Sequence, residues 1–417
     1  MTGPDTALAV PAPEAPNGSR WAGLRQVSVL RFGLVGQGLT FAAMLLPIVL
    51  REGHQIAVLV FTSAIATAAV SSALLGYQFV FPVIRGPRAA VVATRLSFTT
   101  LAATSLLLLP LTLIEGRIGV PGGSFASAAA LLFTMGLYVI TVTRLVRAAD
   151  TAGIGLVRLL YGGALLILTG VASLWQVTPL GLTLANTTAY LTPALYVALR
   201  HRTPELGHPH VTAAARRRIR RAVLRRSIRP TFSTLADGWA FFLPGIALPG
   251  LGIAEQPWAI VTRICGGFST INLTIIAPPM EARAAKAVRE RNETAYLHGR
   301  RVALSIGAAL SVTALGIGLS LALYQNWDTA PRWLVPVAIA AGLYFVVLLA
   351  MQPINRTPNF VGRHGARLAW DIARATLVTV AFLTTDGIVR LMAIGAVLSV
   401  FGLLLLPLSR YPARPQA

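Results

Sequence analysis

The chain has 417 residues, of which 55% are hydrophobic and only 12% are charged, and its net charge is +22 at pH 7. Soluble domains carry roughly 25% charged residues, so this composition excludes a soluble globular protein and indicates an integral membrane protein. The basic residues lie in short segments between apolar runs, a placement that argues against nucleic-acid binding and is typical of membrane insertion.

About 20 apolar residues are needed to cross a bilayer, and this criterion predicts twelve transmembrane helices, which a basic connector divides into two halves of six. Residues 1–26 are predicted to be a disordered cytoplasmic tail, because their Pro-rich start shows no periodicity. The N-terminal bundle, 27–199, holds spans at 27–49, 56–84, 89–113, 124–143, 152–174 and 178–199. The C-terminal bundle, 231–408, holds spans at 231–253, 256–279, 302–323, 332–353, 366–384 and 388–408. A basic cytoplasmic connector, 200–230, joins the bundles, and 409–417 form a second cytoplasmic tail.

The orientation follows from the distribution of basic residues. With the N-terminus inside, the cytoplasmic segments hold 27 of them and the opposite segments hold 4. This asymmetry predicts that both termini are cytoplasmic. The connector segment Thr212 to Arg229 contains eight arginines and the loop Glu281 to Arg301 is also basic and helix-prone, so both are expected to lie as helices along the cytoplasmic leaflet.

Glycines and prolines punctuate the spans. The stretch Gly33 to Gly38 looks like a dinucleotide-binding loop, but no strand precedes it, so its glycines are predicted to permit close helix packing. Proline and glycine at 244–245 and 249–250 predict a double break in the seventh span, which is either a hinge or a static kink.

Ionisable residues inside a span are costly and mark candidate sites. Six stand out: Arg31, Arg95, Arg158, Asp237, Arg263 and Arg374. At about 1.5 Å per residue, Arg263 lies some 6 to 13 Å in from the outer side, and the others lie equally deep from the cytoplasmic side. The arginines either extend back to the headgroups or line a cationic cavity for an anionic head group, since guanidinium binds phosphate bidentately and keeps its proton.

Two aspartates lie in these spans. Asp237 either neutralises one of the arginines or couples transport to a proton, and Asp371 is expected to pair locally with Arg374. No catalytic constellation is apparent, so the protein is not expected to be an enzyme, and no cofactor is implied. A metal site is also not expected, because His208 and His210 are joined by no cluster of Cys or carboxylates.

Two stretches, Ser28 to Leu50 and Ala259 to Ala285, together with twelve spans and a midpoint connector, resemble the flippases of polysaccharides and lipid-linked oligosaccharides. These belong to the multidrug/oligosaccharidyl-lipid/polysaccharide exporter superfamily. The resemblance implies a MATE-like fold, namely a V-shaped pair of bundles that opens alternately to either side. It also implies a bacterial inner-membrane protein and a substrate that is a polyprenyl-pyrophosphate-linked glycan moved to the outer leaflet for cell-surface polysaccharide synthesis.

The same resemblance places Arg31, Arg95, Arg158 and Arg263 in a cationic cavity and implies membrane lipids and glycan-assembly enzymes as partners. Two alternatives stay open. One is a cation-coupled exporter of drugs or small molecules from the same superfamily, although the first span has no acidic residue for such coupling. The other is a membrane scaffold of a glycan-assembly complex that transports nothing.

Overall fold

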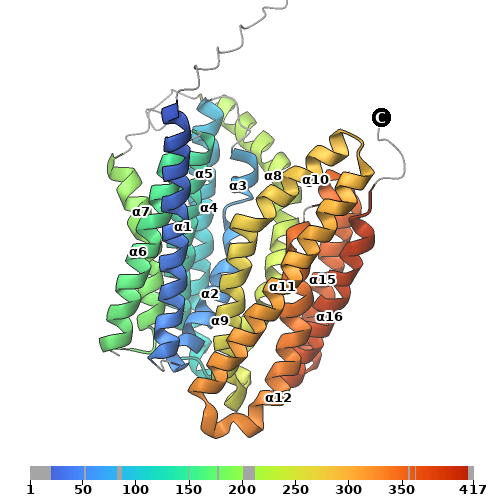
Figure 1. Cartoon of the computed structure of the whole chain (residues 1–417). Helices are drawn as coiled ribbons and strands as arrows, with labels where there is room; N and C mark the ends of the chain where they lie inside the picture. Colours follow the sequence, from blue (N-terminus) through green and yellow to red (C-terminus); the bar gives the residue numbers. More distant parts are fainter. Residues whose placement is uncertain are drawn as a thin grey trace, which may run out of the picture.

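The computed structural model describes residues 20–50, 53–81, 87–148, 150–175, 178–200, 212–355, 357–361 and 363–411, and these ranges contain helices and no strand. The predicted tails lie largely outside these ranges, as does the first part of the connector. α1 begins at Arg20, inside the segment predicted as a tail, because no proline follows until Pro47. The described helices, α1 included, pack into two bundles that stand side by side (Figure 1).

The first bundle contains α1 Arg20–Val49, α2 Gly53–Ala73, α3 Tyr77–Val80, α4 Pro87–Leu108 with η2 Leu109–Arg117, α5 Ser124–Arg147, α6 Thr151–Trp175 and α7 Gly181–Arg200. The second contains α8 Ala213–Ile246, η4 Leu248–Gly250, η5 Gly252–Ala254, α9 Glu255–Ile271, η6 Asn272–Ile276, α10 Ala277–Arg289, α11 Glu293–Gln325, η7 Trp327–Thr329, α12 Ala330–Ala341, η8 Gly342–Val346, α13 Val347–Met351, η9 Gln352–Ile354, α14 Thr357–Phe360, α15 His364–Thr384 and α16 Gly387–Leu408.

These segments coincide in position with the twelve spans expected from the sequence. Within the described residues, seven helices are apolar and long enough by themselves to cross a membrane. Other spans miss that criterion for visible reasons, since α8 carries arginines and the eighth span is divided into α9, the π-turn η6 and α10. The expected all-α polytopic membrane fold, with about twelve helices in two six-helix bundles, is confirmed. We call the end where α1 begins and α16 ends the basic end, and the opposite end the distal end (Figure 1).

The seventh span differs from the prediction in two ways. α8 is one continuous helix of 34 residues, so the basic segment 213–229 is not a separate surface helix, because its Ala and Arg residues are strong helix formers and Pro230 does not end it. The predicted double break is the distal end of the span, since Pro244 lies in the last turn of α8 and Pro249 belongs to η4. The basic loop Glu281 to Arg301 is likewise divided between α10 and α11.

Helices α1 and α6 cross with their backbones almost in contact. A Cβ atom added at Gly36 would lie 2.7 Å from the carbonyl of Arg158, and one added at Gly162 would lie 2.3 Å from the carbonyl oxygen of Gly36. Small residues allow such approach in a membrane, where packing replaces the hydrophobic effect. The glycines at 33–38 therefore serve helix packing, and a nucleotide loop is excluded because they lie inside α1.

We expect Gly162→Ala to lower the free energy of unfolding by about 1 to 3 kcal/mol, because its methyl group would overlap the α1 backbone. Thermal unfolding of the detergent-solubilised protein measures the effect. Gly163→Ala is the matched control, since a Cβ atom there meets nothing within 4 Å. Equal unfolding temperatures for the two variants would contradict the crossing.

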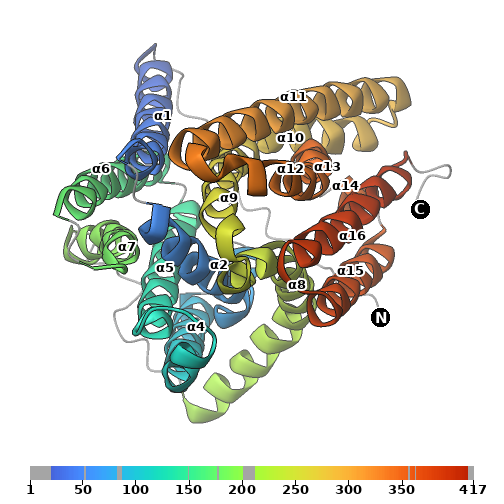
Figure 2. The same cartoon turned by 90° about the horizontal axis from the view of Figure 1, so that it is seen from below.

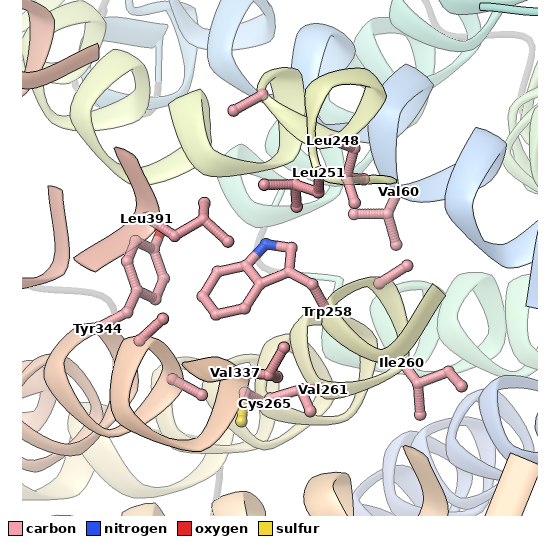
Figure 3. Packing of buried hydrophobic residues seen from close by; sticks show 14 of the residues in the cluster. Val60, Leu248, Leu251, Trp258, Ile260, Val261, Cys265, Val337, Tyr344 and Leu391 are labelled. Atoms are coloured by element: carbon pink, nitrogen blue, oxygen red, sulfur yellow. The ribbon is translucent and has the colours of Figure 1, made fainter. Parts of the chain in front are cut away.

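The two bundles share a hydrophobic core at the distal end. Trp258 of α9 is fully buried there beside Val60 of α2, Leu251 and Tyr344 (Figure 3). α2 and α8 approach closely through small residues, because a Cβ atom at Gly245 would lie 2.6 Å from the Cβ atom of Ala64. α2, α8 and α9 thus lie between the remaining helices of the two bundles (Figure 2).

Candidate functional site

The structure does not gather the five predicted arginines in one place. Arg31 lies on α1, but its side chain is outside the described part of the chain. Arg95 is exposed on α4. Arg158 and Arg263 approach a common cluster of tyrosines, whereas Arg374 lies deep in the second bundle and is paired with carboxylates. Of the four arginines whose side chains the structure describes, Arg158 and Arg263 therefore share one region, Arg374 belongs to a second region of different chemistry, and Arg95 lies in neither.

Three tyrosines from neighbouring helices of the first bundle form an aromatic cluster. Tyr161 of α6 stacks on Tyr190 of α7 with ring centroids 4.5 Å apart, and their hydroxyl groups are hydrogen-bonded. Tyr138 of α5 completes the cluster, with ring centroids 5.4 Å from Tyr161 and 5.5 Å from Tyr190. All three side chains are half-buried, so each ring combines an apolar face with a polar hydroxyl at partly accessible depth.

Two arginines flank the tyrosine cluster. Arg158 lies three residues before Tyr161 on α6 and is within electrostatic range of the Tyr138 hydroxyl, and Arg263 of α9 is within the same range of the Tyr161 hydroxyl. At about 1.5 Å per residue, Arg158 lies roughly 10 Å from the start of α6 at the basic end, and Arg263 lies roughly 12 Å from the distal start of α9. The cluster is thus bounded by one cation toward each end of the bundle.

Arg263 also connects the bundles through the backbone of α1. Its Nε donates to the carbonyl oxygen of Met44 at 3.1 Å, and its Nη2 donates to that of Ala43 at 3.4 Å. Pro47 has no N–H, so the carbonyl of Ala43 loses its donor inside the helix. Arg263 supplies the missing donor from the other bundle, and since a guanidinium has five N–H groups, these two bonds leave further donors on it.

The second region is an ion-pair network between α15 and α8. Asp371 is fully buried and accepts two hydrogen bonds of 3.1 Å from Arg367 and one of 2.7 Å from Ser233 of α8. Arg374 lies 3.5 Å from Asp371 and donates to Asp237 of α8. Both guanidinium groups lie over the ring of Trp370, whose centroid is 4.5 Å from Cζ of Arg367 and 4.3 Å from Cζ of Arg374. Two acids and two bases make the network neutral.

The geometry favours one of the two readings of Asp237. Its carboxylate is paired with Arg374, although 42% of its side chain remains accessible. An acid that binds a cation in exchange for a proton must be released from such a partner first. Arg374 likewise has its charge balanced within the second bundle, so it is a poor candidate for holding an anionic substrate.

A cavity of about 360 Å³ lies at the distal end, between the bundles. Its first-bundle wall includes His54 of α2 and Ser124 of α5, and its second-bundle wall includes Glu255 of α9 and Asn326. Burial raises the pKa of Glu255, which lies outside the predicted span, while the nearby His54 acts in the opposite direction. The cavity therefore has an ionisable residue on each wall, His54 on the first-bundle side and Glu255 on the second-bundle side.

We expect Glu255→Gln to raise the unfolding temperature at pH 7. An acid whose folded pKa is raised holds its proton more tightly in the folded state, so its ionisation destabilises the fold as the pH rises through that pKa. The gain should vanish near pH 4, where Glu255 of the wild type is protonated. A gain that is the same at both pH values would contradict this account.

Two groups of residues near these sites were not predicted from the sequence. Tyr138, Tyr161 and Tyr190 were not singled out, because tyrosines in apolar spans are common and three separate helices bring them together. Arg367 and Trp370 were also not singled out, although their spacing of three and four residues from Asp371 and Arg374, which were expected to pair, places them on the same face of α15.

No protein-family model matches this chain, and no curated protein matches it in sequence. Solved structures match it over nearly the whole length. An inward-facing conformation of a multidrug resistance MATE family transporter of the MOP superfamily is 14% identical, covers 91% of this chain and 94% of its own, and gives a TM-score of 0.53. A MATE in complex with MaD3S is 13% identical, with 93% and 95% covered and a TM-score of 0.51.

At these identities the likeness concerns the fold. The chain has the architecture of MATE transporters, so the MATE-like fold expected from the sequence is confirmed, and the chain is a multi-pass membrane protein.

Proposed function

We propose that this protein is a transporter of the bacterial inner membrane that flips a polyprenyl-(pyro)phosphate-linked oligosaccharide from the inner to the outer leaflet, for synthesis of cell-surface polysaccharide. The basic end faces the cytoplasm, as the asymmetry of basic residues indicates, and both termini lie there. Alternating access follows from the two-bundle fold: the bundles rock about α2, α8 and α9 to open the basic or the distal end.

The observation that carries the proposal is the tyrosine cluster with Arg158 and Arg263. A lipid-linked oligosaccharide presents phosphate oxygens next to sugar rings. Guanidinium groups bind phosphate bidentately, and the apolar faces of tyrosine rings suit the C–H faces of sugars while their hydroxyls suit the sugar hydroxyls. Because Arg158 lies toward the basic end and Arg263 toward the distal end, the phosphate can pass from one cation to the other during the transport step.

The second candidate is a cation-coupled exporter of drugs or small molecules, favoured by the fold it shares with a multidrug resistance MATE transporter. That function needs an acid that binds a cation. Asp237 is paired with Arg374, and α1 from Arg20 to Val49 carries no acidic residue. These facts favour the anionic substrate. The third candidate is a membrane scaffold that transports nothing. It gives no role to Arg158 of α6 and Arg263 of α9.

Proteoliposomes distinguish the three. We expect the wild type to expose a polyprenyl-pyrophosphate-linked oligosaccharide to an external glycosidase and to export no cationic dye. Arg158→Gln should reduce the initial rate by about 10- to 100-fold, since charged hydrogen bonds contribute about 1.5 to 3 kcal/mol. Arg158→Lys should retain part of it. The matched control is Arg332→Gln, an exposed arginine at the distal turn.

Dye export that Asp237→Asn abolishes, without glycolipid movement, would establish the exporter instead. Wild-type protein that moves neither substrate but co-purifies with glycosyltransferases would establish the scaffold.

A further inference from the structure

The basic first half of α8 is an exposed charged surface that the transport site does not use. Residues 213–229 contain eight arginines, and the first acidic residue of α8 is Asp237. Six of these arginines have exposed side chains in the structure: Arg216, Arg217, Arg218, Arg220, Arg221 and Arg225. The other cytoplasmic segments hold two or three basic residues each, except 281–301, which holds six, so residues 213–229 carry more charge than topology requires.

The two faces of this segment have different surroundings. At 3.6 residues per turn, the six exposed arginines cover an arc of about 200° around the helix axis. Ile219 and Val223 lie on the remaining arc and are half-buried, and Val223 packs against the cluster that contains Leu74, Tyr77 and Phe81 of the first bundle. The apolar stripe is therefore occupied by protein, and the arginine arc faces outward.

The helix geometry places this arc at the membrane surface. The 34 residues of α8 extend about 51 Å, whereas the hydrocarbon layer is about 30 Å thick, so about fourteen residues exceed a perpendicular span. Viewed along the bundle axis, α7 appears nearly end-on, but α8 runs sideways and its first turns extend away from both bundles (Figure 2). An inclined helix of this kind keeps its first turns near the headgroup layer and does not project far into water.

We propose that the outward face of residues 213–229 binds the phosphate head groups of anionic phospholipids in the leaflet at the basic end. Each basic residue near an anionic surface strengthens such binding by roughly fivefold. Guanidinium suits the task because it matches phosphate oxygens bidentately and is weakly hydrated. The bound lipids fix the inclination of α8, and since α8 packs on α2 and continues to Asp237, they bias how the two bundles sit against each other.

Site-specific quenching tests this proposal. Cys265 is fully buried, so the exposed position Ala214 can be labelled selectively with a fluorophore in the Ala214→Cys variant. In vesicles without glycolipid, we expect brominated phosphatidylglycerol to quench the label at least threefold more than the same mole fraction of brominated phosphatidylcholine. The combined variant Arg217→Gln, Arg221→Gln, Arg225→Gln should remove that preference, its lysine counterpart should keep most of it, and 0.5 M salt should weaken it.

A matched control neutralises Arg283, Arg291 and Arg301 to Gln, which are exposed at the same end on α10 and α11 and in the turn between them. This variant should leave the preference at position 214 unchanged. Equal quenching by the two lipids would overturn the proposal. So would stronger quenching by brominated phosphatidylglycerol that persists when Arg217, Arg221 and Arg225 are all replaced with Gln. A label that stays fully accessible to iodide in anionic vesicles would point to a soluble acidic partner. A preference that appears only after adding polyprenyl pyrophosphate would assign the surface to the lipid-linked substrate.

Discussion

Replacing Asp371 with Asn is expected to lower the free energy of unfolding by about 3 to 5 kcal/mol, because it leaves a buried arginine without its counter-charge. Arg367 is itself buried and directs two N–H groups at Asp371. The Asn side chain keeps the shape but offers one carbonyl oxygen and no charge. Unfolding of the detergent-solubilised protein by heat or denaturant measures the loss.

The pair of Arg390 with the exposed Asp386 provides the matched control, since it has the same i, i+4 spacing at the distal end. The side chain of Asp386 is 97% accessible, so Asp386→Asn should cost less than about 1 kcal/mol. Replacing both Arg367 with Met and Asp371 with Leu should recover most of the stability, because a buried ion pair can be exchanged for apolar residues of similar volume. A double variant no more stable than Asp371→Asn would show that the network is held by other contacts.

The second large effect concerns the contact between Arg263 and α1. Arg263→Met leaves the carbonyls of Ala43 and Met44 without this donor, and we expect it to shift the protein toward the distal-open state by about 1 to 3 kcal/mol. Spin labels at His54→Cys and Gln256→Cys, on opposite walls of the distal cavity, measure the opening as a population of longer distances.

Pro47→Ala separates this explanation from a general loss of packing. It restores an N–H that can bond to the carbonyl of Ala43, so in its background the loss of Arg263 should matter less, with a coupling of about 1 kcal/mol. Gln325→Leu is the control, because Gln325 donates to the carbonyl of Ile48, which the proline does not free. Additive effects of Pro47→Ala and Arg263→Met would contradict the role assigned to Arg263.

The two regions have different electrostatic characters for a reason visible in the structure. Arg158 and Arg263 have tyrosines and backbone carbonyls as neighbours, so their charges remain available to an anion. Arg374 and Arg367 have acids as neighbours, so their charges stabilise the second bundle. Depth in the membrane was therefore a poor guide to which arginine could meet a substrate. The charged or neutral character of its neighbours determines whether an arginine can bind an anion. In the second region, three of the four ionisable residues, Arg367, Asp371 and Arg374, lie on one face of α15.

The sequence by itself determined the class of protein, the number and approximate limits of the spans and the asymmetry of charge, because each depends on a local run of residues of a given length. It also indicated the resemblance that led to the MATE-like fold. The tertiary structure alone decided which ionisable residues meet. Arg263 finds the carbonyl of Ala43, which Pro47 leaves without its donor, more than 200 residues away, and Tyr138, Tyr161 and Tyr190 come together from three helices. The extension of α8 through Pro230 was decided in the same way, because local propensity gives the helix while packing against the first bundle determines that it continues. Contacts of this kind depend on how helices cross, and a periodic pattern within one helix carries no information about its neighbours.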